Sequence, residues 1–259
     1  MPDLLRLEPH GPDTFVGESP RYEWGRIYGG LVIAQALTAA MRTVDSQGHV
    51  VHSLHAYFIL GGDPREPVRY EVDRLRNGRS FSTRQVVARQ SSGAILNLSA
   101  SFQRPEDGPD VSSSTFPRDA RQPEDLEKSP WGVGLDARIE LESREPPRHR
   151  LWCRFTDPLG DGEHYAALAY LSDGNPMDAI RAAHPSNPGE RKQHEVFMAA
   201  SLDHAVWFHR PVRADEWLLF DMRSHQLIGT RGLATGDVFT RQGTLVATVA
   251  QQGLIRLKR

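Results

Sequence analysis

Two stretches of the chain lack the polar stripe that marks a surface helix. The first runs from Gly29 to Met41 and is apolar almost all round, with Gln35 as its one large polar residue. The second, at 164–173, has the same character and ends at Asp173. A surface helix shows polar side chains along one face at a period near 3.6 residues. Both stretches are therefore predicted to be buried helices.

β-rich segments separated by Gly, Pro, Asp and Asn surround these helices. An apolar helix of this kind is hidden only if a sheet wraps around it, so the pattern predicts an α+β fold of two similar halves. Strands are predicted in the first half at 51–60, 67–76, 81–90 and 94–102, and in the second at 136–144, 150–157, 199–208, 216–223, 231–240 and 244–257.

The two halves also share local sequence. Ser53-Leu54-His55 is similar to Ser201-Leu202-Asp203, about 150 residues later, which is typical of an internal duplication. From about Arg104 to Trp131 the chain is rich in Pro, Ser and acidic residues, as expected of a solvated connection. We therefore predict an N-terminal domain at 1–104, a linker at 105–131 and a C-terminal domain at 132–259.

Composition narrows the function classes. Lys and Arg number 31 against 33 Asp and Glu, a net charge of −2 without a basic cluster, which argues against nucleic-acid binding. The first residues do not form a secretory signal, and 18 apolar residues never run together, so we expect no membrane span and a cytoplasmic location. Cys153 is the single cysteine, which excludes an internal disulfide.

Several common catalytic motifs are missing. The chain contains no G-x-S-x-G, no G-x-x-x-x-G-K-[ST], no G-x-G-x-x-G after a strand and no H-E-x-x-H. Cys153 alternates on to the side of Leu151 and Phe155, as a core residue does. The pairs His52/His55 and His204/His209 have odd spacing, which places each pair on opposite faces of a strand and disfavours a metal site.

Three polar residues in apolar surroundings are candidate site residues. Asp173 continues the stripe of Ala166, Ala169 and Tyr170, where a desolvated carboxylate needs partners; alternatively it is a turn residue, with the helix ending at 174–176. Ser201 shares a strand face with Asp203, and Gln251 lies in a strand that is apolar on both faces. On pattern alone, structural hydrogen bonds within the sheet are the preferred explanation of Ser201 and Gln251.

An ordered set of motifs spread over nearly the whole chain resembles the acyl-CoA thioesterase II family. The matching stretches are 27–37 (IYGGLVIAQAL), 51–58 (VHSLHAYF), 62–64 (GDP), 77–81 (NGRSF), 169–173 (AYLSD), 201–204 (SLDH), 206–211 (VWFHRP), 231–232 (RG) and 251–256 (QQGLIR). Gln252 stands where the family often has Glu, and Leu31 where it often has Gln, which leaves pocket details open.

The resemblance implies a double hotdog, with one sheet-wrapped helix in each half. It also implies hydrolysis of fatty acyl-CoA to free acid and CoA, without metal or cofactor. The family's site is an acid at the end of the second helix, a Ser or Thr two residues before Asp-His, and a Gln in the last strand. Matched motif by motif, these are Asp173, Ser201 and Gln251. Ser101 stands opposite Gln251 in the other half, so one site per chain is expected.

For the mechanism we favour direct attack by water, with Asp173 as base and with Ser201 and Gln251 holding the water. An acyl-enzyme on Asp173 or Ser201 is the alternative, and His204 is expected on the opposite strand face from Ser201. Amides at Gly29 and Gly30, at the start of the first helix, are candidate oxyanion donors.

Two other functions stay open. A hotdog enoyl-CoA hydratase would need an Asp and a His together over the double bond, and the same pocket could bind acyl-CoA without catalysis. By analogy we expect a homodimer or a larger even homo-oligomer.

Overall fold

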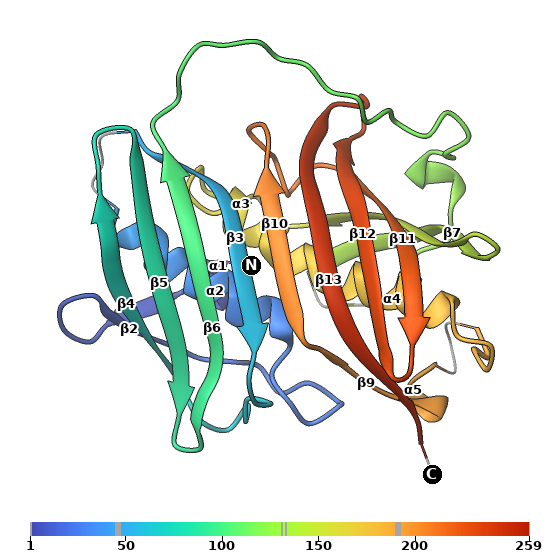
Figure 1. Cartoon of the computed structure of the whole chain (residues 1–259), viewed down its shortest axis with the longest axis horizontal. Helices are drawn as coiled ribbons and strands as arrows, with labels where there is room; N and C mark the ends of the chain where they lie inside the picture. The colour runs from blue at the N-terminus through green and yellow to red at the C-terminus, as the bar shows by residue number, and fades with distance from the viewer. Residues whose placement is uncertain (1, 45–47, 131, 133, 190–192, 259) are drawn as a thin grey trace. The chain divides into compact units, whose positions relative to one another are not determined.

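The chain divides into two compact units, which are described separately. The structure, a computed structural model, describes residues 2–44, 48–130, 132, 134–189 and 193–258 (Figure 1). Unit 1 comprises Met1–Val111, Leu159–Tyr170 and Ala205–Phe208, and unit 2 comprises Ser112–Pro158, Leu171–His204 and His209–Arg259.

Two short segments differ from the predicted domain ranges. The segments 159–170 and 205–208 lie within the range predicted for the C-terminal domain, yet they cluster with unit 1. Aromatic contacts account for this. The ring of Tyr170 meets that of Tyr28 edge-on at 4.9 Å, and the ring of Trp207 meets that of His55 edge-on at 5.1 Å.

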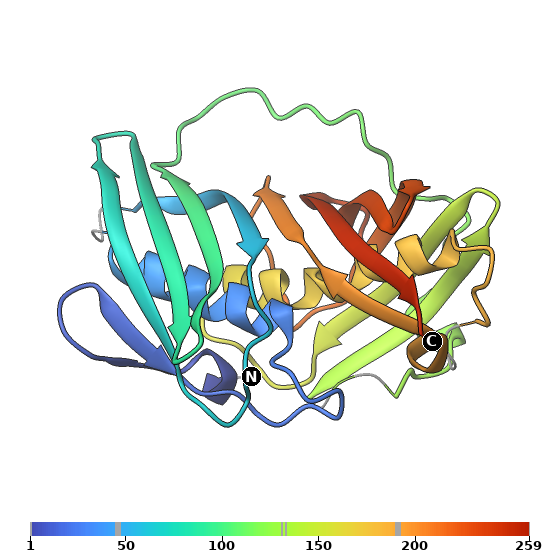
Figure 2. The same ribbon diagram turned by 60° about the horizontal axis from the view of Figure 1, so that its bottom comes forward.

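Unit 1 is an antiparallel sheet that packs on one long helix. The sheet order is β1-β2-β4-β5-β6-β3, and the helix α2 (Gly29–Arg42) packs against β3, β4, β5 and β6 (Figure 2). The remaining elements are α1 (Pro2–Leu5), β1 (Leu7–Pro9), β2 (Thr14–Gly17), β3 (Val50–Phe58), β4 (Val68–Asn77), β5 (Phe81–Gln90) and β6 (Gly93–Gln103).

The helix α2 is buried as predicted. Leu31, Ile33 and Leu37 are fully inaccessible, and the helix buries small residues on its other sides. Gln35, its buried polar residue, donates to the carbonyls of Leu4 and Glu18 and accepts from the Tyr70 hydroxyl. Its amide is thereby satisfied at both ends, as burial requires.

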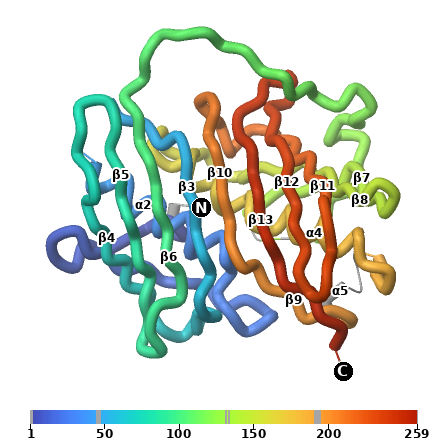
Figure 3. Tube along the Cα trace, viewed as in Figure 1, coloured from blue at the N-terminus to red at the C-terminus, as the bar shows by residue number. Residues whose placement is uncertain are grey.

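Unit 2 also consists of antiparallel paired strands with a helix against them. The order is β13-β12-β11-β8-β7, β9 pairs with β13 near the C-terminus (Figure 3), and α4 (Gly174–Ala182) packs against β8, β11, β12 and β13. The strands and short helices are η1 (Pro123–Asp125), β7 (Leu135–Arg144), β8 (Pro147–Phe155), α5 (Gln193–Val196), β9 (Phe197–Ser201), β11 (Leu218–Ile228), β12 (Arg231–Thr240) and β13 (Leu245–Leu257). Two further elements, α3 (His164–Ser172) and β10 (Asp203–Phe208), run from one unit into the other.

The predicted strands match the observed ones closely. Two predictions, one on a helix and one on a strand, need correction. The helix predicted at 164–173 is α3, which ends at Ser172, but the helix α4 that begins directly after Asp173 was not predicted; α4 tolerates Pro176 in its first turn, where amides lack intrahelical partners. The strand predicted at 199–208 is two strands, interrupted at Leu202. There the Asp203 side chain accepts a hydrogen bond from the backbone amide of Gln252, in place of a ladder bond.

The predicted linker has two different parts. Residues 104–113 are exposed and irregular. Further on, Phe116 and Ala120 pack against a buried cluster that contains Leu126, Trp152, Trp217 and Leu219. The second part of this segment therefore contributes to the core of unit 2. Within the described residues, no helix is long and apolar enough to cross a membrane.

Candidate functional site

Asp173 lies at the junction of α3 and α4, and only 3% of its surface is exposed. Its backbone keeps helical angles, φ −69° and ψ −38°, so the two helices follow each other with this one residue between them. A carboxylate at such a junction is expensive to desolvate unless other groups donate hydrogen bonds to it.

Ser201 supplies one such donor. It is the last residue of β9, and its Oγ donates to Asp173 Oδ1 over 2.9 Å. An ionised carboxylate accepts at about four lone-pair positions, so this bond leaves it able to accept from further donors. Ser201 is half-buried, whereas Asp173 is buried.

Gln251 closes the cluster from β13, where it is fully buried. Its Nε2 donates to Ser201 Oγ over 2.8 Å and to the backbone carbonyl of Asp173 over 3.1 Å. The structure therefore brings the three predicted residues, Asp173, Ser201 and Gln251, into one hydrogen-bonded group within unit 2. They come from a helix junction and two strands that are far apart in sequence.

His204 extends this group, and the sequence analysis did not assign it a role. Its Nδ1 lies 2.5 Å from Gln251 Oε1, and its Nε2 lies 2.8 Å from Ser172 Oγ. Both Nε2 protons of Gln251 point to oxygen acceptors, so its Oε1 must accept from His204. A neutral imidazole that donates from Nδ1 accepts at Nε2, here from the Ser172 hydroxyl.

Burial keeps His204 neutral. Desolvation lowers the pKa of its imidazole, while the charges of Asp173 and Asp203 act in the opposite direction. The sequence did contain a signal for His204, because it alternates with the apolar residues Val206 and Phe208. In the structure all three are buried on one face of β10, and His204 is 1% exposed. We predicted that His204 lies on the face opposite Ser201. That prediction assumed a single strand, whereas Ser201 ends β9 and His204 belongs to β10.

Gly30 is constrained by packing within unit 1. A Cβ atom at Gly30 would lie 2.5 Å from the Tyr170 carbonyl and from the Tyr28 ring, and the Tyr28 hydroxyl donates to that carbonyl. The amides of Leu31 and Val32 bond to the carbonyl of Tyr28. A ligand-binding role for Gly29 or Gly30 stays a prediction.

Two further residues considered in the sequence, Cys153 and Ser101, lie in surroundings that do not favour catalysis. Cys153 is fully buried in β8, and burial raises the pKa of its thiol well above the usual range, which opposes formation of a thiolate. Ser101 in unit 1 bonds through its hydroxyl to His52 Nε2 over 2.8 Å. Neither environment resembles the buried group around Asp173.

Two family models together match most of the chain. Residues 19–103 match the family model "Acyl-CoA thioesterase N-terminal domain", and residues 101–255 match "Acyl-CoA thioesterase C-terminal domain". The chain is 36% identical to mouse acyl-coenzyme A thioesterase 8, covering 98% of this chain and 88% of that protein. It is 35% identical to acyl-CoA thioesterase 2 of Haemophilus influenzae, covering 98% and 96%.

Solved structures give the same result. The acyl-CoA thioesterase II TesB2 from Mycobacterium marinum is 37% identical, with a TM-score of 0.86 over 99% of this chain and 98% of that one. A protein with a hot dog fold from Alicyclobacillus acidocaldarius has a TM-score of 0.79 at 19% identity, over 100% and 98%, and so bears on the fold alone.

Proposed function

Because the chain belongs to the acyl-CoA thioesterase II family and is a thioester hydrolase, we propose that it hydrolyses fatty acyl-CoA to free fatty acid and CoA at Asp173, Ser201 and Gln251. The observation that carries the proposal is the relay of hydrogen bonds from the Gln251 amide to the Ser201 hydroxyl and from that hydroxyl to the Asp173 carboxylate. A buried carboxylate that accepts from the Ser201 hydroxyl, which in turn accepts from the Gln251 amide, is suited to orient and deprotonate a water molecule.

In the proposed reaction the water oxygen bonds to the thioester carbon. Asp173 takes a proton from that water, and the carbon–sulfur bond then breaks. The acid keeps the oxygen of the water, and the sulfur leaves with CoA, which receives the proton from Asp173. Ser201 and Gln251 position the water, and a positioned base of this kind contributes about 10²- to 10⁴-fold in rate.

Direct attack is preferred to an acyl-enzyme on Ser201. The Ser201 hydroxyl faces a carboxylate and an amide, and both ring nitrogens of His204 are occupied by Gln251 and Ser172. Ser201 therefore lacks the histidine base that usually activates a serine nucleophile. The same two bonds of His204 disfavour a hydratase, which would need a histidine nitrogen directed at substrate.

We further propose that each unit is a hotdog, so that the chain is a double hotdog. The packing of α2 on the strands of unit 1, the packing of α4 on the strands of unit 2 and the similarity to a solved hot dog protein support this. The domain ranges predicted from sequence, the cytoplasmic location and the even-numbered homo-oligomer stay predictions.

The activity is tested by measuring CoA release from a series of C4 to C18 acyl-CoA thioesters. Release of free acid and CoA in equal amounts is expected for at least part of the series. Binding of acyl-CoA without release would instead indicate a binding protein. Loss of the absorbance of an enoyl-CoA without CoA release would indicate a hydratase.

A further inference from the structure

One helix face in unit 2 carries Asp173 together with two apolar residues of α4. Because Asp173 has helical backbone angles and α4 begins at the next residue, Asp173, Met177 and Ile180 follow one another at the i, i+4, i+7 spacing of a single face. Met177 and Ile180 are buried, and α4 packs against β12 and β13. The face that presents the Asp173 carboxylate to its hydrogen-bond partners is therefore also the face that packs on these strands.

Two glycines lie beneath the apolar part of this face. Gly232 of β12 and Gly253 of β13 are register partners, and both are buried. A Cβ atom at Gly232 would lie 2.2 Å from Cγ2 of Ile180, and one at Gly253 would lie 2.2 Å from Sδ of Met177. Neither glycine has a left-handed backbone, so it is the close approach of α4 that excludes a side chain at both positions. We call this pair the glycine seat.

The glycine seat adjoins the Asp173 group, by which we mean Asp173, Ser201 and Gln251. Gln251 and Gly253 are two residues apart in β13, so they lie on the same face of that strand. Ser201 is the register partner of Gly253 in β9. The strand residues that bond to Asp173 therefore lie next to the glycines on which the following turns of the helix pack.

The comparable hairpin of unit 1, β5–β6, carries side chains at both positions. Gly232 is the second residue of β12 and pairs with Gly253. In β5 the second residue is Ser82, which pairs with Phe102, and both are buried. Paired strands of this kind do not themselves require glycine at this register, and the glycine pair occurs in the unit that contains the Asp173 group.

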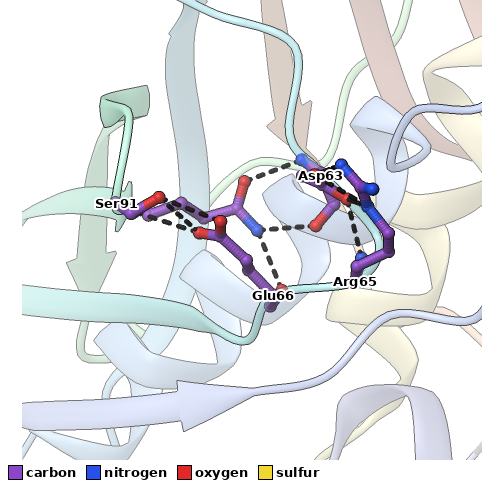
Figure 4. Close-up of polar contacts among 5 residues, drawn as sticks. Asp63, Arg65, Glu66 and Ser91 are labelled. Atoms are coloured by element: carbon purple, nitrogen blue, oxygen red, sulfur yellow. Dashed lines mark hydrogen bonds and ion pairs between the residues drawn. The ribbon is translucent and has the colours of Figure 1, made fainter.

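A polar group of unit 1 shows by contrast what the Asp173 group needs. Asp63 accepts hydrogen bonds from Nε and Nη2 of Arg65, two residues further along the same loop (Figure 4). Asp173 and Gln251 are instead 78 residues apart, at a helix junction and in a strand. A hydrogen bond needs its donor and acceptor within about 2.7 to 3.2 Å of each other. The distance between the helix and β13 therefore has to be set by packing to within a few tenths of an ångström.

We propose that Gly232 and Gly253 are positioning residues for the proposed hydrolysis. Because they lack side chains, α4 packs close to β12 and β13, and this closeness sets the distance from the Asp173 carboxylate to Ser201 and Gln251. The inference rests on the function proposed for the Asp173 group. The two glycines act through Asp173.

The two glycines differ in how firmly they hold the helix. Cγ2 of Ile180 is bonded to a branched Cβ, and a branched side chain in a helix has one strongly preferred χ1 rotamer. A methyl group at position 232 would therefore move the helix itself. Sδ of Met177 belongs to a flexible side chain, so a methyl group at position 253 would move the helix less.

The test introduces a methyl group at Gly232 and then makes room for it from the helix. Gly232→Ala is expected to lower kcat for acyl-CoA by about ten- to a hundredfold with little change in KM, because a base displaced by about 1 Å loses that much rate. Ile180→Leu removes Cγ2 at nearly equal volume, so Gly232→Ala combined with it should recover most of the kcat of Ile180→Leu alone. Ile180→Val is the matched control. It keeps the clashing atom, so Gly232→Ala should lower kcat on that background as much as in the native protein.

Circular dichroism and urea unfolding identify the variants that are folded. Two results would overturn the proposal, namely native kcat in folded Gly232→Ala and equal recovery on the Ile180→Leu and Ile180→Val backgrounds. If Gly232→Ala does not fold, Gly253→Ala takes its place, because the flexible Met177 accommodates part of the added methyl group. Its kcat is expected to fall by about threefold or more, and native kcat there would also overturn the proposal.

A signal that needs no turnover separates this proposal from the proposed function. His204 donates from Nδ1 to Gln251 and accepts at Nε2 from Ser172, the residue before Asp173. In protein with ¹⁵N-labelled histidine, the Nδ1–H resonance of His204 should therefore shift in Gly232→Ala and return when Ile180→Leu is added. A protein that releases no CoA but shows this shift and its return would refute the proposed hydrolysis and keep the role of the glycines in placing the helix. An unshifted resonance would refute that role whatever the activity.

Discussion

The Nδ1 of His204 lies 2.5 Å from Oε1 of Gln251, and both side chains are buried. Through this bond His204 fixes which end of the Gln251 amide faces Ser201. With the amide reversed, an oxygen would face the Ser201 hydroxyl and the Asp173 carbonyl, and the donor to Ser201 would be lost. His204 therefore acts as a positioning residue for the proposed site.

A pair of substitutions at His204 separates positioning from packing. In His204→Asn the side-chain amide nitrogen takes the place of Nδ1, and kcat is expected to stay within about threefold of native. In His204→Gln the amide nitrogen takes the place of Nε2 and retains the contact with Ser172 only. There we expect kcat to fall by about tenfold or more with little change in KM, because a hydrogen bond in this network contributes roughly 1 to 3 kcal/mol. Equal losses in both variants would mean that His204 has a packing role alone.

The neutral state of His204 also predicts a pH dependence of stability. Its folded pKa lies below the ordinary value near 6.5, so below that pH the unfolded chain binds a proton that the folded chain does not. The free energy of unfolding should therefore decrease as the pH falls from about 6.5 toward the folded pKa, and it should not depend on this group above 6.5.

Urea unfolding of the native protein and of His204→Asn at pH 7.5 and pH 5.5 measures this contribution. The histidines His52, His184 and His209 also have lowered pKa values, but both proteins contain them, so they cancel in the comparison. The variant is expected to lose less stability than the native protein on acidification. An identical loss in the two proteins would show that His204 is not the titrating group.

Ser201 distinguishes water attack from an acyl-enzyme. If Ser201 only holds the water, Ser201→Ala should lower kcat by about ten- to a hundredfold, and Ser201→Thr, which keeps the hydroxyl, should stay within a few-fold of native. A nucleophile would show a much larger loss in Ser201→Ala. Mass spectrometry of the native protein during turnover is the independent measurement, and an acyl adduct on Ser201 or Asp173 would contradict direct attack.

A substitution at Phe116 tests whether the second part of the predicted linker contributes to the core of unit 2. Its ring meets that of Phe239 edge-on at 5.7 Å and lies 6.2 Å from that of Trp152. Phe116→Ala should lower the free energy of unfolding by about 1 to 3 kcal/mol, which is less than for a fully buried Phe. Val111→Ala is the control, because Val111 is 90% exposed and its truncation should have little effect. A stable Phe116→Ala protein would mean that the segment does not support unit 2.

Alternation and apolar content predicted most of the fold, because these signals are local. The helix at 29–42 and the strands at 81–90 and 231–240 agree with the structure to within a residue or two. The short strands β1 and β2 were missed, since three or four residues are too few to show a period. The break at Leu202 was missed because the Asp203 side chain replaces a backbone acceptor, which alternation does not register.

The site was less predictable from pattern alone. Pattern marked Asp173, Ser201 and Gln251 as polar residues in apolar surroundings, but the partners of Asp173 lie 28 and 78 residues further along the chain, and only the family resemblance joined the three into one site. The role of His204 depends on the orientation of the Gln251 amide, which is a property of the folded structure.

The account depends most on Asp173 as the base. Asp173→Asn keeps the shape and can still hydrogen-bond to Ser201, but it cannot accept the proton of the water. With circular dichroism to verify folding, kcat for a good acyl-CoA substrate is expected to fall by about 10²-fold or more, with KM changed little. A folded Asp173→Asn protein that releases CoA at the native rate would contradict the central claim.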